Sequence, residues 1–253
     1  DGAIGTDDQR DRVKAEAPAV RALLYFQLVN IYGEPYNYNK EALGVPLKLD
    51  ANLSNEPIAR ATVAEVYEDV LVPDLIEAAR LMDPLDYVEH NYRINQPAIH
   101  ILLSRVYLYM NRYQDCIDEV AKAMDYGIRV MNLTTEFNPA DASTYGYNPF
   151  DYNNPEVVWI FGPATRIDNS GYKLALDEAF QSLWDSENDM RYSMFKLSAP
   201  DTGSTTDYDN SNFIITKPYS TSQLCQTIRT SEAVLNEMEA NALLGNETDA
   251  LQA

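Results

Sequence analysis

The residues best suited to chemistry are concentrated between residues 144 and 154, where aromatic rings alternate with amides and carboxylates. A flat ring offers an apolar face to a ligand, and the polar groups beside it can satisfy the hydrogen-bonding groups of that ligand on burial. The candidate ligand-binding residues of this segment are Tyr145, Tyr147, Asn148 and Tyr152. The alternative interpretation is a loop held together by its own aromatic rings.

Two further places in the chain combine rings with polar neighbours. Trp184 lies at the end of a predicted helix beside acidic and amide residues, and we include it as a candidate ligand-binding residue. Its alternative role is a core ring at the helix end. Tyr36 and Tyr38 alternate with asparagines, a spacing that is also typical of a surface turn.

Catalytic and metal-binding motifs are hard to find in this chain. Neither His90 nor His100 belongs to a nucleophile or metal-ligand pattern, and His100 is better explained as structural. Residues 207–212 alternate oxygen ligands as a calcium loop would, but the glycine and distal glutamate of an EF-hand are missing. We therefore expect no catalytic residue, no metal and no cofactor, and we expect binding rather than turnover.

The composition excludes several classes of partner. The 253 residues carry a formal charge of −20, so the chain should repel nucleic acids and should not adhere to anionic lipid through basic patches. There are only two cysteines, Cys116 and Cys225, and the default for both is a buried free thiol. No apolar run reaches the length of about 18 residues that a membrane span needs. The 18 tyrosines favour recognition of a polar ligand.

The elements that must position the candidate residues are mostly helices. Residues 96–127 predict a helical hairpin of tetratricopeptide type, with Pro97 in the first turn, a turn at Asn111 and a stop at Gly127. Small side chains would let its two helices approach closely; they are Ser104, Cys116 and Ala123. Such a unit buries its apolar face only by stacking on neighbours.

Other helices and strands follow from periodicity and capping patterns. A helix over residues 7–32 either starts near Pro18 or kinks there, and an extended loop follows to residue 60. A capping box at Thr62 and Glu65 opens a helix to about Met82, kinked at Pro73. Strands are predicted at 156–161 and 213–217, and helices at 174–184 and 222–244.

By composition and predicted secondary structure, the chain therefore divides into three parts. Residues 1–131 form a helical-repeat scaffold, residues 132–221 a loop-rich ligand-binding region, and residues 222–253 a final repeat helix that packs on the scaffold. The predicted fold class is mainly α: a tetratricopeptide-like helical-repeat scaffold, an α-α superhelix, with an irregular region that contains short strands.

Several stretches, in the order of the chain, resemble the SusD/RagB family of glycan-binding outer-membrane lipoproteins. The first is VRALLYFQLVNIYGEP, which matches the family pattern at Arg21, Ala22, Tyr25, Phe26, Leu28, Tyr32 and Gly33. The second helix region matches at Arg60, Thr62, Val66, Tyr67, Asp74, Leu75, Ala78 and Ala79. The hairpin, the run PEVVWIF and the element at 189–191 resemble later parts of the family. The last repeat helix matches at Arg229, Glu232, Leu235, Glu239 and Ala240.

This resemblance implies a function and a place in the cell. A SusD-like protein would capture an oligosaccharide or polysaccharide outside the cell, without cleaving it, and deliver it to a SusC-like TonB-dependent barrel transporter. It would sit at the outer membrane on a lipid anchor that lies outside this chain, facing the extracellular side. The family's lipidated segment and its continuation beyond the last helix are absent from the sequence, and we expect a piece of a longer precursor.

Two alternatives come from other classes of protein. A tetratricopeptide-type adaptor would bind a protein or peptide on its helical surface, but it should not need a segment rich in Tyr and Asn such as 144–154. A glycoside hydrolase needs only two carboxylates at the right separation. The 39 acidic residues permit that chemistry, but no pair stands out.

Overall fold

The computed structural model describes residues 4–53, 56–87, 92–136, 154–162 and 226–251, together with residues 174–175, 182–183, 185, 187–188 and 214–215. Within these residues the fold is mainly α, as predicted. The longer helices are α1 (Asp7–Tyr32), α4 (Val72–Met82), α5 (Gln96–Tyr109), α6 (Tyr113–Met124) and α11 (Thr230–Leu244). The short ones are α2 (Tyr36–Asn39), α3 (Val63–Val66), α7 (Leu133–Glu136) and α12 (Glu247–Ala250), and η1 (Tyr67–Leu71) is a π-helical turn.

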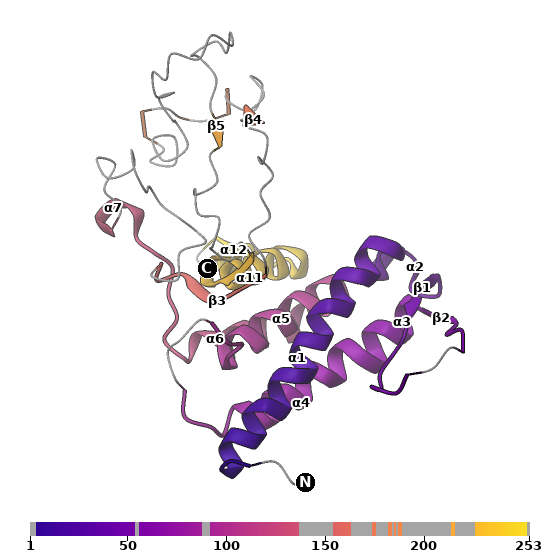
Figure 1. Cartoon of the computed structure of the whole chain (residues 1–253). Helices are drawn as coiled ribbons and strands as arrows, with labels where there is room; N and C mark the ends of the chain where they lie inside the picture. Colours follow the sequence, from indigo (N-terminus) through magenta and orange to yellow (C-terminus); the bar gives the residue numbers. More distant parts are fainter. Residues whose placement is uncertain are drawn as a thin grey trace, which may run out of the picture.

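The strands form three separate antiparallel pairs: β1 (Leu43–Pro46) with β2 (Arg60–Thr62), β3 (Val157–Phe161) with β6 (Gln226–Arg229), and β4 (Leu174–Ala175) with β5 (Ile214–Ile215). The long helices form one body, with the β3–β6 pair at one side of it; β4 and β5 lie beyond that pair, away from the helices (Figure 1). None of the helices in the described part of the chain is long and apolar enough to span a bilayer.

Helix α1 begins well before Pro18 and runs through it. Thr6 and Gln9 form a capping box at its start, and Gly33 ends it. The buried side chains of the helix are Ala15, Ala19, Ala22, Leu23, Tyr25, Phe26 and Val29. A second apolar stripe at helical spacing lies on the opposite side of α1. Its side chains are exposed, at Val13 56%, Leu24 53%, Leu28 41% and Ile31 69%. The helix is therefore apolar on two faces, of which the core uses one.

The helix predicted for residues 62–82 is divided into three parts. Thr62 and Glu65 form the predicted capping box, but a π-helical turn follows and α4 then carries Pro73 in its first turn. In that wide turn the backbone N–H of Val72 bonds the carbonyl of Tyr67, five residues back. The wider turn explains how the segment continues past a proline, which lacks the N–H that a regular helix needs.

The expected loop between residues 36 and 60 contains structure. Residues 36–39 form α2, and β1 pairs with β2 across the remainder. Arg60 holds this pair, because its guanidinium donates to the carbonyl oxygens of Gly44 at 2.6 Å, Leu43 at 2.7 Å and Tyr32 at 3.0 Å.

The helical hairpin is confirmed, and α5 is the most buried helix in the described part of the chain. Asn95 caps its start, Asn111 takes the left-handed conformation in the turn at φ 58°, and Gly127 does so after α6 at φ 76°. Cys116 is buried, as predicted, and Ser104 also has no exposed surface. They contact α11 through Asn236, whose Nδ2 donates to Ser104 Oγ at 3.0 Å and whose carbonyl lies 3.7 Å from Cys116 Sγ.

The last predicted helix starts later than expected. Residues 226–229 form β6, so Ile228 belongs to a strand, and α11 begins only at Thr230. The buried face of α11 is small and partly polar, at Thr230, Ala233, Asn236, Ala240 and Asn241, whereas Leu235 is 61% exposed. Residues 174–175, expected in a helix, form β4, while the strand predicted near 213–217 is present as β5. These segments are strands because each pairs with another strand that is distant in the sequence.

Charged residues that carried the family resemblance fasten the helices together. Arg21 of α1 donates from Nε and Nη2 to the two carboxylate oxygens of Asp74 in α4, both at 2.7 Å. Likewise, Nε and Nη2 of Arg105 in α5 donate to the two carboxylate oxygens of Glu232 in α11, at 2.5 and 2.7 Å. Two-pronged contacts of this kind fix orientation as well as distance, so these residues belong to the scaffold.

Candidate ligand-binding region

The candidate ligand-binding residues lie outside the described residues. They are Tyr145, Tyr147, Asn148, Tyr152 and Trp184. The calcium-like segment 207–212, the element at 189–191, His90 and Cys225 also lie outside. The structure does describe the strands that precede and follow residues 163–225 in the chain, and we call this pair of strands the base.

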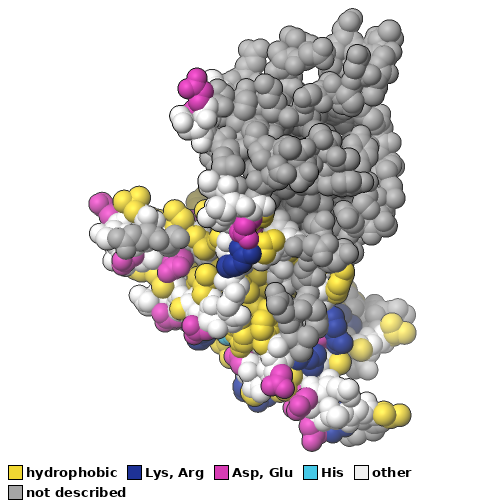
Figure 2. All heavy atoms as spheres, turned by 90° about the vertical axis from the view of Figure 1, so that its left-hand side faces the viewer, with side chains coloured by type: hydrophobic (Ala, Val, Ile, Leu, Met, Phe, Trp, Pro, Cys, Tyr) yellow, Lys and Arg dark blue, Asp and Glu magenta, His cyan; other side chains and the backbone are white. Residues whose placement is uncertain are grey.

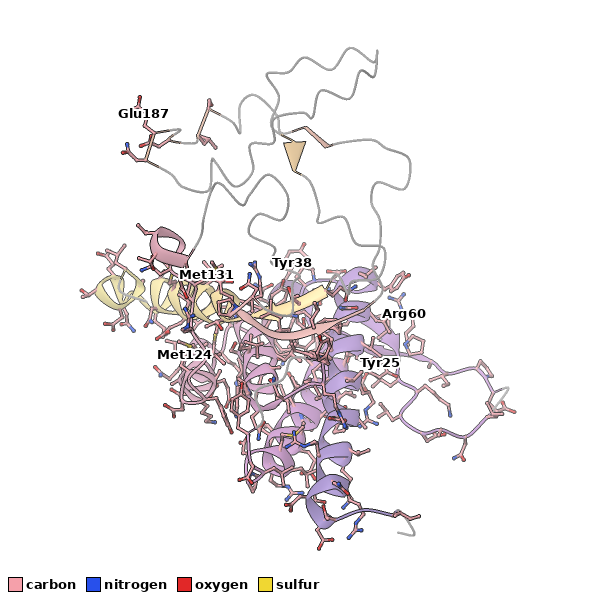
Figure 3. All side chains as sticks on the ribbon, turned by 60° about the vertical axis from the view of Figure 1, so that its left-hand side comes forward. Tyr25, Tyr38, Arg60, Met124, Met131 and Glu187 are labelled. Atoms are coloured by element: carbon pink, nitrogen blue, oxygen red, sulfur yellow. The ribbon has the colours of Figure 1, made fainter. Side chains whose placement is uncertain are left out.

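The base is the antiparallel pair of β3 and β6. Phe161, the last residue of β3, is opposite Gln226, the first residue of β6. The chain between these two strands therefore leaves and re-enters the described fold at neighbouring points. Figure 3 shows Met131 near α11, at the edge of the scaffold, and Glu187 away from the long helices. Binding residues are often carried by segments that a scaffold of helices or strands positions.

A bulge in β3 ties this pair to the scaffold. The register shifts between Val157 and Trp159, which leaves Val158 at the irregularity. Its carbonyl accepts a hydrogen bond from Nδ2 of Asn95 at 2.9 Å, while Oδ1 of the same side chain accepts from the N–H of Ala98 at 3.1 Å and caps α5. Asn95 is 2% exposed. One buried amide thus joins the start of α5 to the base of the loop-rich region.

Glu156, immediately before β3, is the centre of a second set of contacts. Its side chain is buried, accepts from the N–H of Met131 at 2.9 Å, and lies 3.7 Å from Nη1 of Arg229. Its backbone carbonyl accepts from the N–H of Thr230 at 2.9 Å, and its own N–H donates to Asn154 Oδ1 at 2.9 Å. Sequence reasoning missed Glu156 and Asn95. The available signals were an acid at the start of an apolar run and an Asn just before a helix.

An ion pair closes the segment that leads out of α6. Arg129 donates to both carboxylate oxygens of Glu136, at 2.6 and 2.8 Å, and the backbone N–H of Asn132 donates to the same carboxylate at 2.7 Å. The guanidinium of Arg129 and then the N–H of Asn132 lower the pKa of Glu136 to about 2. The carboxylate is therefore charged at any physiological pH, and it holds α7 in place.

The tyrosine pair near α2 is divided between packing and solvent. The hydroxyl of Tyr36 donates to Glu68 Oε1 at 2.6 Å, and its ring centroid lies 5.0 Å from that of Tyr67. Tyr38 is 80% exposed. Because the polar end and one face of Tyr36 are already engaged, these residues fit a surface turn better than a sugar platform.

His100 is structural, as expected. It is 3% exposed, with Nδ1 at 2.7 Å from Glu119 Oε2 and Nε2 at 3.2 Å from Asp83 Oδ1. Burial alone would lower its pKa, but hydrogen bonds and charge from the two carboxylates outweigh burial and raise the pKa to about 9. Neither nitrogen is left to act as a base. Among the described residues no group of His, Cys, Asp and Glu is arranged to hold a metal.

The visible surface of the described part has no single-sign basic stripe. Acidic side chains are scattered across the face that Figure 2 shows, with hydrophobic side chains between them. This distribution agrees with the formal charge of −20.

Comparison with known proteins bears on the family directly. Residues 4–108 match a SusD-like family model described as "Starch-binding associating with outer membrane". A solved structure of a SusD superfamily protein from Bacteroides thetaiotaomicron is 25% identical, with a TM-score of 0.73 over 99% of this chain. The resemblance to the SusD/RagB family is confirmed. The SusD-like match covers α1 to α5, including both Arg21 and Asp74.

Other solved structures share the fold. A putative sugar binding protein from Bacteroides vulgatus is 23% identical with a TM-score of 0.75, and a laminarin binding SusD-like protein is 18% identical with a TM-score of 0.65; each match covers 99% of this chain. The chain spans 59%, 57% and 65% of the three solved chains, in the order named. Curated proteins give no match.

Proposed function

We propose that this SusD-like chain belongs to a protein that captures oligosaccharides or polysaccharides without cleaving them. The observation that carries the proposal is the match of residues 4–108 to a family model described as starch-binding. Sugar-binding and laminarin-binding proteins of the same fold support the same class of ligand.

The proposed division of labour follows the three parts of the chain. Residues 1–131 and 222–253 hold the base, and residues 132–221 bear the sugar site, with contacts from Tyr145, Tyr147, Asn148, Tyr152 and Trp184. The described base supports this division, because Asn95 and Glu156 fix the strand pair against the helices. A rigid support lets loops present aromatic rings in a constant geometry.

The proposed location is the outer membrane, on a lipid anchor, facing the extracellular side. The captured glycan would pass to a SusC-like TonB-dependent barrel transporter, and no step of this process breaks a bond. The description of the matching family as associating with the outer membrane supports the location. The engagement of both nitrogens of His100 by carboxylates supports capture rather than catalysis.

The test is direct binding, first on a glycan array that includes starch and laminarin and then by calorimetry. Replacing Tyr145, Tyr147 and Tyr152 together with Ala should weaken binding at least about tenfold, because buried aromatic anchors carry much of a binding energy. Tyr38→Ala is the matched control and should bind as the wild type does. Trp184→Ala is the parallel test.

Each outcome has a defined meaning. Binding to no glycan on the array would overturn the proposed function, and turnover of any polysaccharide would replace it with hydrolysis. Unchanged affinity of the triple variant would remove residues 145–152 from the site. A collapse of stability in Trp184→Ala would mark that ring as core.

A further inference from the structure

Three passages of the chain meet at Glu156, two of them through its carboxylate. The first passage leaves α6 and reaches the carboxylate through the N–H of Met131. The second is the approach to β3, where Asn154 and Glu156 bond each other. The third follows β6, where Nη1 of Arg229 lies 3.7 Å from the carboxylate and the N–H of Thr230 donates to the Glu156 carbonyl.

The carboxylate of Glu156 is buried where these passages meet. The side chain retains 5% of its surface, and a charged carboxylate is costly to remove from water unless hydrogen bonds and an opposite charge compensate it. The N–H of Met131 and the guanidinium of Arg229 supply that compensation from two different passages. Bonds between a charged group and an N–H are stronger and more directional than neutral ones.

We propose that Glu156 is a positioning residue, a clasp that sets the loop-rich region against the scaffold and thereby sets the geometry of the glycan site. This inference rests on the proposed function. Residues 137–153 lie between Met131 and Asn154, so the clasp holds the chain on both sides of this stretch. Residues 163–225 leave from the other end of the strand pair, at Phe161 and Gln226. Small displacements of a binding constellation are expensive, so loosening the roots should weaken binding.

A neighbouring ion pair provides the matched control. Glu232 sits in the first turn of α11, close to the clasp in sequence, and both its oxygens accept from Arg105 of α5. Its role is to join two helices of the scaffold. Losing its charge should lower the overall stability and leave the base of the loop-rich region in place.

The experiment compares Glu156→Gln with Glu232→Gln in the full chain. Glutamine keeps the size of the side chain but loses its charge and brings an N–H₂ group, which conflicts with the donors of Met131 or Arg229. We expect Glu156→Gln to weaken binding of starch or laminarin about fivefold to tenfold and to speed hydrogen exchange at the amides of Met131 and Thr230. Glu232→Gln should lower the melting temperature with unchanged affinity and unchanged exchange at these amides.

Two results would overturn the clasp: wild-type affinity in Glu156→Gln, or unchanged exchange at both amides. If the wild type binds no glycan, the proposed function fails by itself, and the exchange measurement still decides whether Glu156 fixes the roots. If Glu156→Gln does not fold, Arg229→Met removes the charge opposite Glu156 while keeping the carboxylate, and it must show the same faster exchange in a folded chain.

Discussion

At the scale of the residue, His100 shows how a buried histidine can be held in its charged form. A neutral imidazole carries one N–H, yet both nitrogens of His100 face carboxylates, Glu119 at 2.7 Å and Asp83 at 3.2 Å. Two donated bonds require two protons, so the geometry and the raised pKa of about 9 agree. Lys122 and Tyr126 complete the group, bonding Glu119 and Asp83 respectively. The charge ties α4, α5 and α6 together.

This arrangement predicts a loss of stability at alkaline pH. The folded pKa lies above the unfolded value of 6.5, so the stabilisation is complete below about pH 6.5 and disappears as the pH rises through about 9. Relative to His100→Gln, the wild type should be more stable by about 3 kcal/mol near pH 6, and this advantage should be nearly absent near pH 9.5. Urea unfolding of both proteins at these pH values measures this. An equal difference throughout would show that His100 is neutral.

At the scale of the element, the side chain of Asn95 makes two separate hydrogen bonds. One caps α5, and the other reaches the carbonyl of Val158. Asn95→Ala should destabilise the chain by about 2 to 3 kcal/mol, because it removes the helix cap and leaves the buried carbonyl of Val158 without its donor. Asn95→Asp retains the oxygen that caps α5 but not the N–H₂ group that reaches Val158. Chemical unfolding should rank the wild type above both variants. If the Asp variant matched the wild type, the link to β3 would contribute nothing.

The helices were largely predictable from local signals, whereas the faces and strands were not. Thr62 with Glu65, Asn111 and Gly127 mark boundaries that depend on nearby residues, and the structure confirms them. The exposed stripe of α1 shows the limit: with apolar side chains on both faces, periodicity identifies a helix without saying which face the core uses. Residues 226–229 read as helix because their partner β3 lies about 70 positions earlier in the chain, beyond any local window.

The candidate site was predictable only in part for the same reason. Composition identified residues 144–154 as a candidate ligand-binding loop, and that assignment stays a prediction because these residues lie outside the described part of the chain. Glu156 and Asn95 act through partners 25 and 63 positions away. No local sequence pattern around Glu156 or Asn95 indicates these partners, so only the folded structure reveals the contacts.

At the scale of the whole molecule, the opposition of Phe161 and Gln226 allows a severe test of the scaffold. Replacing residues 162–225 with an Asn-Gly turn should join β3 to β6 as a two-residue hairpin, because antiparallel strands in direct register accept such a turn. We expect the shortened chain to unfold cooperatively with its helical circular dichroism retained. Loss of helicity would show that the helices depend on the removed residues.

The meeting of these strand ends has an evolutionary consequence. A segment that departs and returns at one spot can lengthen, shorten or change composition while the helices keep their spacing, since each doubling of a loop costs only about 0.6 kcal/mol in closure entropy. Mutation can then vary residues 163–225 while the remainder of the gene stays under selection for folding.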